Sequence, residues 1–295
     1  MELREILEIK EILGHESKYF QYFKGRYQLM LLSMLCGERM SLNKIKSSSF
    51  GKLLNCPQVK KCMSSIRNKS LASIDLANYE PESYEDYWIT ISCWGDTIWD
   101  EDYHQTSRPG YNLVLQLNFG NQHNMKYYDL FKSDDRSFVC GEHPVNRSYK
   151  TMAWCRMDID FDRDQVLIEE IQNDWIRYAI DAHKEGDDKD LSEYVDNVLK
   201  PYRQSWDEAM LSAAIQFIKE DLGIGHIYYH TNTCGYILKN ISKDDRPPES
   251  LYKKLPKRFC FELVEHGPTF LYELHRGKNW QKYMANMQFY YLSFN

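Results

Sequence analysis

Polar and acidic side chains crowd the end of one apolar run, VLIEEIQNDW, at residues 166–175. Glu169, Glu170, Gln172 and Asp174 supply carboxylates and an amide, groups that accept protons or hold ligands. Side chains two apart on a strand share a face, so Glu170, Gln172 and Asp174 are expected on one side and Glu169 on the other. This cluster predicts a ligand or catalytic site at a strand end; capping of the next segment and an exposed strand edge are the alternatives.

A second polar patch follows the apolar segment GHIYYHT. His230 offers a general base and Cys234 a nucleophile, with Asn232 between them. A helical crossover usually returns the next strand parallel and alongside, so His230 is expected to share a cleft with Gln172 and Asp174. A histidine that simply satisfies its hydrogen bonds is the alternative.

The segment SRPGYNLVLQLNF supplies a third set of polar groups. Arg108, beside Ser107 and before Pro-Gly, is a candidate clamp for a phosphate or carboxylate, and a turn arginine is the plainer explanation. Gln116 and Asn118 lie on an otherwise apolar strand, so their amides need partners if they are buried.

Metal binding is only weakly indicated. Cys140 and His143 form a single CxxH, and a zinc site could be completed only by His230 and Cys234. No metal is therefore expected. The eight cysteines include no CxxC pair, which is typical of reduced thiols.

The elements that must position these residues change type near residue 80. Residues 1–78 have apolar positions at helical spacing and no strand signal, so a helical N-terminal region is expected. After the polar stretch NYEPESYED the period becomes two. The expected strands are 86–94, 112–119, 151–161, 165–172, 224–231 and 257–264, the last followed by TFLYEL at 269–274.

Strands and helices alternate in the second half. An Asp-Arg-Asp turn joins the strands at 151–161 and 165–172 and predicts a hairpin. Residues 205–223 have a serine cap, an acidic first turn and a closing glycine, which predict a helix. The charged segment at about 175–204 is expected to be a helical insertion in a mixed-sheet α/β domain of residues 79–295.

The string VLIEEIQNDW resembles the EIQSDW-signature domain of bacterial and phage-encoded proteins, where it is often one module of a large polyvalent protein. TMAWCRMDID before it and LYKKLPKRFCF after it also fit this domain, so the resemblance covers about residues 150–265. It implies a bacterial or phage-related protein and carries no activity with it.

The order of elements resembles the core of GNAT-type N-acetyltransferases. In those enzymes acyl-coenzyme A lies where two parallel strands splay, with its pyrophosphate at the start of the long helix. The matching loop here, PYRQSWDEA, has no glycine. The resemblance implies a catalytic set, with Glu169 or Glu170 as base, Tyr252 as acid and His230 as a further candidate. It implies Gln172, Asp174, Arg203 and Gln204 as cofactor-binding residues.

The expected function is a GNAT-like acyltransferase or coenzyme-binding domain, with acetyl-CoA as the expected donor. One alternative is a non-catalytic interaction module that binds nucleic acid or a partner protein. Another is a transferase that uses a nucleotide cofactor such as NAD, for which Arg108 and the paired glutamates would serve.

Charge is unevenly distributed along the chain. Residues 1–78 carry 13 basic and 7 acidic residues, against 24 and 36 in the remainder. Residues 41–70 contain seven basic residues and no acidic one. They predict contact with a polyanion through Lys44, Lys46, Lys52, Lys60 and Lys61. A second basic set lies near Tyr252, at Arg246, Lys253, Lys254, Lys257 and Arg258. A solvated face is the alternative for both.

Length and composition favour a folded, water-exposed protein. The chain has 295 residues, 43% of them hydrophobic, enough to fill a core. No run approaches the ~20 apolar residues that cross a bilayer, and MELREILEIKEIL fits an amphipathic helix better than a signal peptide. A soluble cytoplasmic product with no membrane contact is expected.

Overall fold

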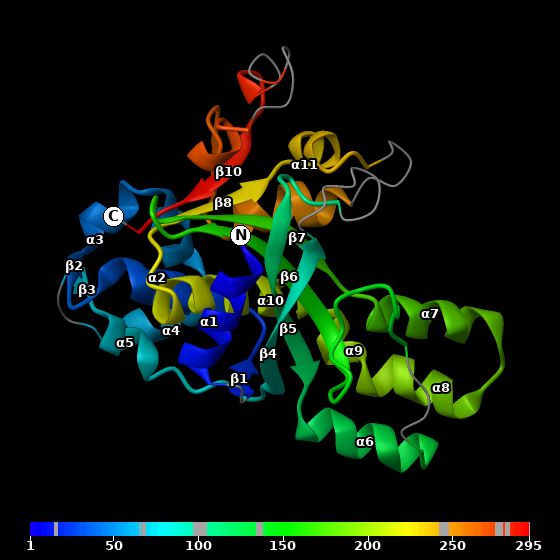
Figure 1. Cartoon of the computed structure of the whole chain (residues 1–295). Helices are drawn as coiled ribbons and strands as arrows, with labels where there is room; N and C mark the ends of the chain where they lie inside the picture. Colours follow the sequence, from blue (N-terminus) through cyan, green and yellow to red (C-terminus); the bar gives the residue numbers. More distant parts are fainter. Residues whose placement is uncertain are drawn as a thin grey trace.

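A computed structural model of the chain describes residues 1–14, 17–64, 66, 69–96, 105–133, 138–241, 248–274, 280 and 284–294. An eight-stranded sheet in the order β1-β4-β5-β6-β7-β8-β10-β9 forms its centre (Figure 1). Its strands are β1 (Lys18–Tyr22), β4 (Glu85–Asp96), β5 (Gly110–Phe119), β6 (Thr151–Asp160), β7 (Gln165–Gln172), β8 (His226–His230), β9 (Glu262–Val264) and β10 (Phe289–Leu292). A separate two-stranded sheet pairs β2 (Met40–Ser41) with β3 (Ser70–Leu71).

The large sheet is mostly antiparallel, and the mixed α/β fold class is confirmed. Only β7 and β8 pair in parallel among the strands described. β6 and β7 form the expected hairpin. The expected long helix is α10 (Trp206–Gln216), extended by the π-helical turn η3 (Phe217–Asp221), and it returns the chain to β8 beside β7.

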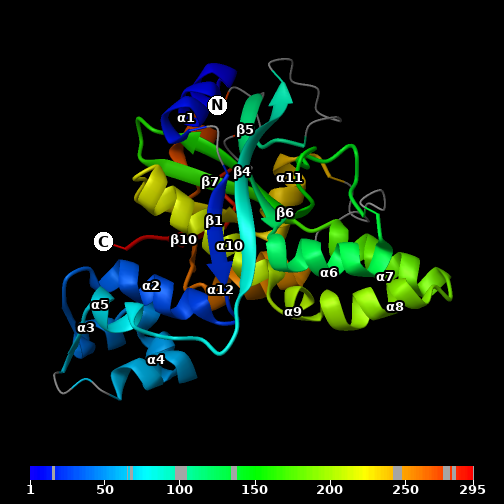
Figure 2. The ribbon, with the colours of Figure 1, turned by 90° about the horizontal axis from the view of Figure 1, so that it is seen from below.

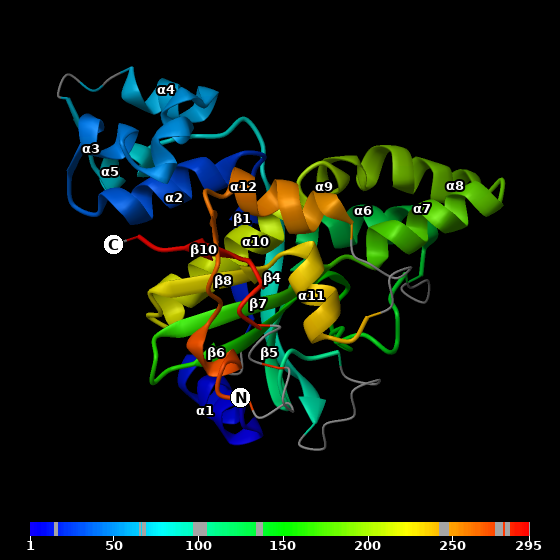
Figure 3. The same ribbon diagram turned by 90° about the horizontal axis from the view of Figure 1, so that it is seen from above.

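Two groups of helices lie at the left and at the right of Figures 2 and 3. On one side are α2 (Arg26–Cys36), α3 (Leu42–Lys46), η1 (Ser49–Asn55), α4 (Pro57–Met63) and α5 (Ser73–Ala77). On the other are α6 (Asn121–Phe131), α7 (Trp175–Glu185), α8 (Lys189–Glu193), η2 (Tyr194–Val198) and α9 (Lys200–Arg203). The remaining helices are α1 (Leu3–Leu13), α11 (Asn232–Leu238), η4 (Ser250–Lys254), α12 (Leu255–Arg258) and η5 (Thr269–Leu271).

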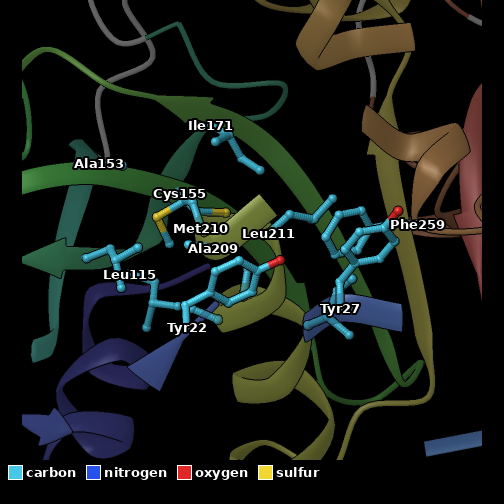
Figure 4. Close-up of a cluster of buried hydrophobic side chains, with 14 of the residues drawn as sticks. Tyr22, Tyr27, Leu115, Ala153, Cys155, Ile171, Ala209, Met210, Leu211 and Phe259 are labelled. Atoms are coloured by element: carbon cyan, nitrogen blue, oxygen red, sulfur yellow. The ribbon is translucent and has the colours of Figure 1, made fainter. Parts of the chain in front are cut away.

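The main core lies between the sheet and α10. Met210 and its helical neighbours pack against Leu115 of β5, Cys155 of β6 and Ile171 of β7, all of them buried (Figure 4). α10 is apolar nearly all round, which is typical of a helix enclosed by other elements. A second cluster on the opposite face joins Leu167 of β7 to α11 and β10.

Three sequence expectations are wrong. A strand, β1, lies within residues 1–78: Phe20 and Tyr22 are buried beside β4, while Tyr19 is exposed and Gln21 is half-buried. The strand expected at 257–264 begins as helix α12, and β9 comprises only its last residues, since Cys260 has a positive φ of 65° that interrupts extended backbone. The strand β10 was not expected. Residues 269–271, at the start of the segment TFLYEL expected after the last strand, form a single 3-10 turn.

No helix in the described ranges is long and apolar enough to cross a bilayer. The segment 175–204 is helical, as expected, and consists of α7, α8, η2 and α9.

Candidate functional site

The parallel strands β7 and β8 separate at their carboxyl ends. Their pairing runs from Gln165 and His226 to Ile168 and Tyr229 and then stops. On its other side β7 has a β-bulge, because Met157 pairs with Ile168 whereas the adjacent Arg156 pairs with Glu170. Glu169 is the extra residue. Bulges re-aim side chains, and this one brings both glutamates into one buried polar network, contrary to the expectation that they face opposite sides.

Glu169 binds side chains from two distant segments. Ser107 donates to it from its backbone N–H (3.1 Å) and its hydroxyl (2.7 Å). Nε2 of His230 lies 3.1 Å from the same carboxylate and 2.9 Å from the Ser107 hydroxyl. All three residues are fully buried. Because one nitrogen of His230 faces both partners and its Nδ1 has no partner in the described part of the chain, this is not a serine–histidine–acid relay.

Glu170 lies between two buried cations. Arg156 donates to its carboxylate, and Lys239 of the turn after α11 donates to it at 3.2 Å. The Lys239 ammonium also donates to the backbone carbonyl of Glu169 at 3.2 Å. The gap that opens beside Glu169 therefore already holds a charged side chain.

Both glutamates stay ionised. Burial by itself raises their pKa values, but hydrogen bonding and charge from His230 and Lys239 lower the pKa of Glu169 to about 2, and Lys239 and Arg156 lower that of Glu170 to about 2. Burial lowers the pKa of His230, although the hydrogen bond and the charge of Glu169 oppose this shift. Carboxylates whose pKa values lie so far below neutral pH are poor proton acceptors.

Gln172 and Asp174 come together, but around His143 rather than His230. Nδ1 of His143 lies 2.7 Å from Oδ2 of Asp174, and Nε2 of Gln172 donates to Oδ1 at 2.8 Å. Nε1 of Trp154 (3.3 Å) and the guanidinium of Arg177 (2.8 Å) complete the set of donors on this carboxylate. His230 belongs to the separate cluster around Glu169.

A cavity of about 590 Å³ opens at this end of β7. Glu170 and Gln172 line it, together with Arg177 and Lys184 of α7 and Trp206 at the start of α10. Several apolar side chains from α7, η4 and the end of α11 complete its wall, at Ile171, Ile176, Ile180, Ile241 and Leu251. Apolar walls with a few polar groups are typical of small-molecule sites. A larger cavity, about 740 Å³, lies between α1 and β4 and includes no residue from the predicted site.

Tyr252, the expected acid, is fully buried beside this site. Its ring packs on Tyr229 with centroids 5.5 Å apart, and its hydroxyl has no hydrogen-bond partner in the described ranges. Burial raises its pKa well above the usual value, so it stays protonated. The other expected cofactor residues, Arg203 and Gln204, are exposed on and just after α9 and do not line the cavity.

Three further candidates lie apart from the cavity. Arg108 binds Asp158 through two hydrogen bonds of 2.6 and 2.8 Å and lies over the ring of Phe270, so the NAD alternative gains no support from it. Cys234 is buried against Met287, and burial raises its pKa well above the usual value. Asn232 is the first residue of α11, whose N-terminus Thr231 caps.

The amides of Gln116 and Asn118 have the partners that their burial requires. Gln116 donates to the carbonyl of Pro144 at 2.8 Å, and Asn118 donates to the carbonyl of Trp88 at 2.9 Å. The bond from Gln116 ties the loop that carries His143 to β5, whereas the bond from Asn118 stays within the sheet. The zinc site considered from the sequence is not assembled, because His143 and His230 have different partners; no group of three potential ligands occurs within the described ranges.

Sequence reasoning missed Arg156, His143 as a partner of Asp174, and Lys239. Lys239 carried one usable signal, since it ends the otherwise apolar helical segment GYILK. A lysine in that place must reach solvent or a buried acid. No local pattern pointed to Glu170 as that acid.

These elements define a mixed α/β protein whose polar network and cavity lie at the carboxyl end of its one described parallel strand pair. Searches with the chain found no matching family model, curated protein or solved structure.

Proposed function

We propose that the protein is a GNAT-like acyltransferase or coenzyme-binding domain, with its ligand in the cavity at the end of β7. The observation that carries this proposal is the separation of β7 and β8 after Ile168 and Tyr229, directly beside that cavity. The EIQSDW resemblance belongs to this proposal as well, since its motif forms the bulge and the cavity rim.

The phosphates of a coenzyme would not bind at the start of α10. Asp207 and Glu208 occupy its first turn, and both carboxylates pair with Arg258, at 2.5 and 2.9 Å. The cations that line the cavity instead come from α7: Arg177, paired with Asp174, and Lys184, paired with Asp181. We therefore assign phosphate binding to Arg177 and Lys184 in place of Arg203 and Gln204.

The reacting end of the ligand would lie toward Glu170 and Tyr252. A protonated hydroxyl such as that of Tyr252, which has no hydrogen-bond partner among the described residues, is suited to give its proton to a leaving thiolate. The strand separation leaves the backbone carbonyl of Glu169 without a strand partner, and Lys239 donates to that carbonyl. A ligand that bonds to this carbonyl must therefore displace Lys239. Coenzyme binding is thus coupled to movement of Lys239.

Titration of acetyl-CoA into the protein tests this proposal. Ligand at 100 times its dissociation constant should add about 2.7 kcal/mol to the free energy of unfolding. Lys184→Gln should weaken binding, whereas Lys189→Gln, the same change at an exposed lysine of α8, should leave it unchanged. Absence of both heat and thermal shift at high coenzyme concentration would remove the acyltransferase proposal.

A second candidate function, polyanion binding without catalysis, is favoured by a different observation. Lys44, Lys46, Lys52, Lys60 and Lys61 are all exposed, and none forms an ion pair with a carboxylate of the described residues. The Lys52 ammonium contacts the carbonyl of Lys257, which joins this basic tract to the second basic set at α12. Arg246 of that set lies outside the described residues.

A further inference from the structure

Two cavities that the proposed function does not use share a wall. One, of about 740 Å³, lies between α1 and β4, and the other, of about 590 Å³, lies beside the start of α6. The residues common to both linings are Trp88 of β4 and Asn146, Ser148 and Tyr149 of the loop before β6. None of the residues that line either cavity also lines the cavity at the end of β7.

Hydrogen bonds and strand pairing hold the shared wall in place. Trp88 pairs with Tyr19 of β1, and the two rings meet edge to face with their centroids 5.3 Å apart. The amide of Asn146 donates to the Thr90 hydroxyl at 3.1 Å, which ties the loop to β4. The hydroxyl of Tyr149 lies 2.9 Å from a serine hydroxyl just before β1. The rings of Trp88 and Tyr149 are half-buried, so part of each remains exposed.

Basic side chains outnumber acidic ones around both cavities. Lys10, Lys18, Arg147 and Lys150 line them, and Asp221, which accepts from Lys18 at 2.8 Å, is the one acid among the described lining residues. The cavity at the end of β7 is lined by two acidic and two basic residues. Because residues 79–295 as a whole are acidic, this excess of basic residues is local. It favours an anionic ligand.

Amide side chains narrow the class of ligand further. Asn121 and Asn124 of α6 line the smaller cavity, and Asn146 lines both. An amide both donates and accepts hydrogen bonds, as the edges of nucleobases do. An oligosaccharide would use the rings and the amides but not the cations, and an acidic peptide would use the cations but not the ring faces. A nucleotide uses all three.

We propose that a single-stranded nucleic acid binds across the two cavities, with bases against Trp88 and Tyr149 and phosphates toward Lys10 and Arg147. Neither of these two cations forms an ion pair with a carboxylate of the described residues. Aromatic platforms beside a basic groove are the common means of binding single strands, whereas a duplex keeps its base faces inside the stack. This inference does not rest on the proposed acyl transfer, and its residues differ from the basic tract at residues 41–70.

Photocrosslinking in the unaltered protein tests the location. The probe is a single-stranded oligonucleotide of about ten residues, within the ~4–16 that single-strand sites cover, in which 5-iodouracil crosslinks to aromatic side chains stacked on it. Mass spectrometry should find crosslinks at Trp88 or Tyr149 with the DNA form, the RNA form or both, and excess duplex should not prevent them. Crosslinks only at other positions, residues 41–70 included, or no binding at low salt would overturn the inference.

Matched variants test the two kinds of contact. Tyr149→Ala should weaken affinity by about 5–150-fold, as expected for a lost stacking ring, whereas Tyr128→Ala, on the exposed side of α6, should leave it unchanged. Arg147→Gln should flatten the dependence of log affinity on log salt by up to about 0.7, and Arg4→Gln, at an exposed arginine of α1, should not.

The outcomes separate this inference from both candidate functions. Affinity and salt dependence that stay unchanged in Tyr149→Ala and in Arg147→Gln would contradict it, even where the lysines of residues 41–70 prove necessary for binding. Arg147 is exposed, so its replacement leaves the fold intact if Tyr149→Ala does not. Absence of acetyl-CoA binding would contradict the acyl transfer and leave the crosslinking result standing.

Discussion

Glu170 illustrates how this protein compensates for charges in its interior. Its carboxylate faces Arg156 and Lys239, whose side chains are 2% and 0% exposed. Desolvation of three charges is costly, and the cost is offset only while each has its partners. The cluster therefore holds β6, β7 and the end of α11 in one arrangement.

Removing one charge of this cluster should destabilise the protein more than removing an acid and a base together. Glu170→Gln leaves two buried cations with one partner fewer and should lower the free energy of unfolding by about 3–5 kcal/mol. Adding Lys239→Met should restore part of that loss, because it removes one unpaired charge. Urea unfolding measures both. Additive losses in the double variant would show that the charges do not act as a cluster.

His123 makes a separate contribution to the loss of stability at acid pH. Burial lowers its pKa from 6.5 to about 3, since the ring is enclosed by Phe119 and Tyr194. The folded protein thus keeps it neutral, while the unfolded chain protonates it below about pH 6.5. Stability from this group is present above pH 6.5 and is lost as the pH falls toward 3.

His123→Phe should therefore flatten the fall in stability between pH 6.5 and about 4.5. The further loss of stability from pH 4.5 toward 2 should remain in this variant. In that range Glu169 and Glu170 become protonated in the unfolded chain while they are still ionised in the folded protein. Thermal unfolding across this pH range gives the measurement. An unchanged slope above pH 4.5 would rule out His123 as its source.

At the scale of elements, β1 links the N-terminal helical region to the large sheet. It precedes α2–α5 in the chain, yet it pairs with β4 over Lys18 to Tyr22. The hydroxyl of Tyr22 donates to Glu208 of α10 at 3.2 Å, so the contact extends through the core. We expect the N-terminal region and the sheet to unfold together.

Phe20→Ala tests that cooperation. The buried ring packs against Tyr22 and Tyr87, and its loss should cost about 3–5 kcal/mol. A single transition, shifted equally for probes in the helices and in the sheet, is expected. Tyr19→Ala, on the exposed side of the same strand, is the control. Two separate transitions would show that residues 1–78 fold independently.

At the scale of the whole molecule, charge is segregated. The excess of basic residues lies in residues 1–78 and the excess of acidic residues lies in the remainder. The helices α3, η1 and α4 carry the exposed lysines; in Figure 3 these helices lie at the left, away from α6–α9 at the right. Under the second candidate function, this separation would present a basic surface to a polyanion without requiring a net positive charge.

If the second candidate function holds, replacing Lys44, Lys46, Lys52 and Lys60 by Gln should weaken binding to DNA or RNA. The dependence of log affinity on log salt should flatten by up to about 0.9 for each phosphate that the variant no longer neutralises. Replacing Lys126, Lys132, Lys189 and Lys200, which are exposed elsewhere, is the matched control. Failure of the unaltered protein to bind at low salt would end this candidate function.

The sequence by itself determined most of the local elements and one long-range relation. Alternating apolar residues predicted the hairpin of β6 and β7, and the apolar α10 predicted the parallel return of β8, because periodicity and crossover handedness are set by the chain locally. It also predicted that Gln172 and Asp174 would lie together, since they are two residues apart, although it placed them with His230 and not with His143. The exposed basic tract followed from composition alone.

Only the tertiary structure decided which side chains bind the carboxylates of the motif at residues 166–175. Ser107, Lys239 and His143 reach the motif from 62, 69 and 31 residues away, and no local pattern encodes which side chain will meet which carboxylate. The bulge at Glu169 likewise depends on the register against β6, and β10 enters between β8 and β9 from the end of the chain. Such contacts form only after long loops close around the core. Their choice therefore depends on the packing of the whole molecule and not on the period of any one segment.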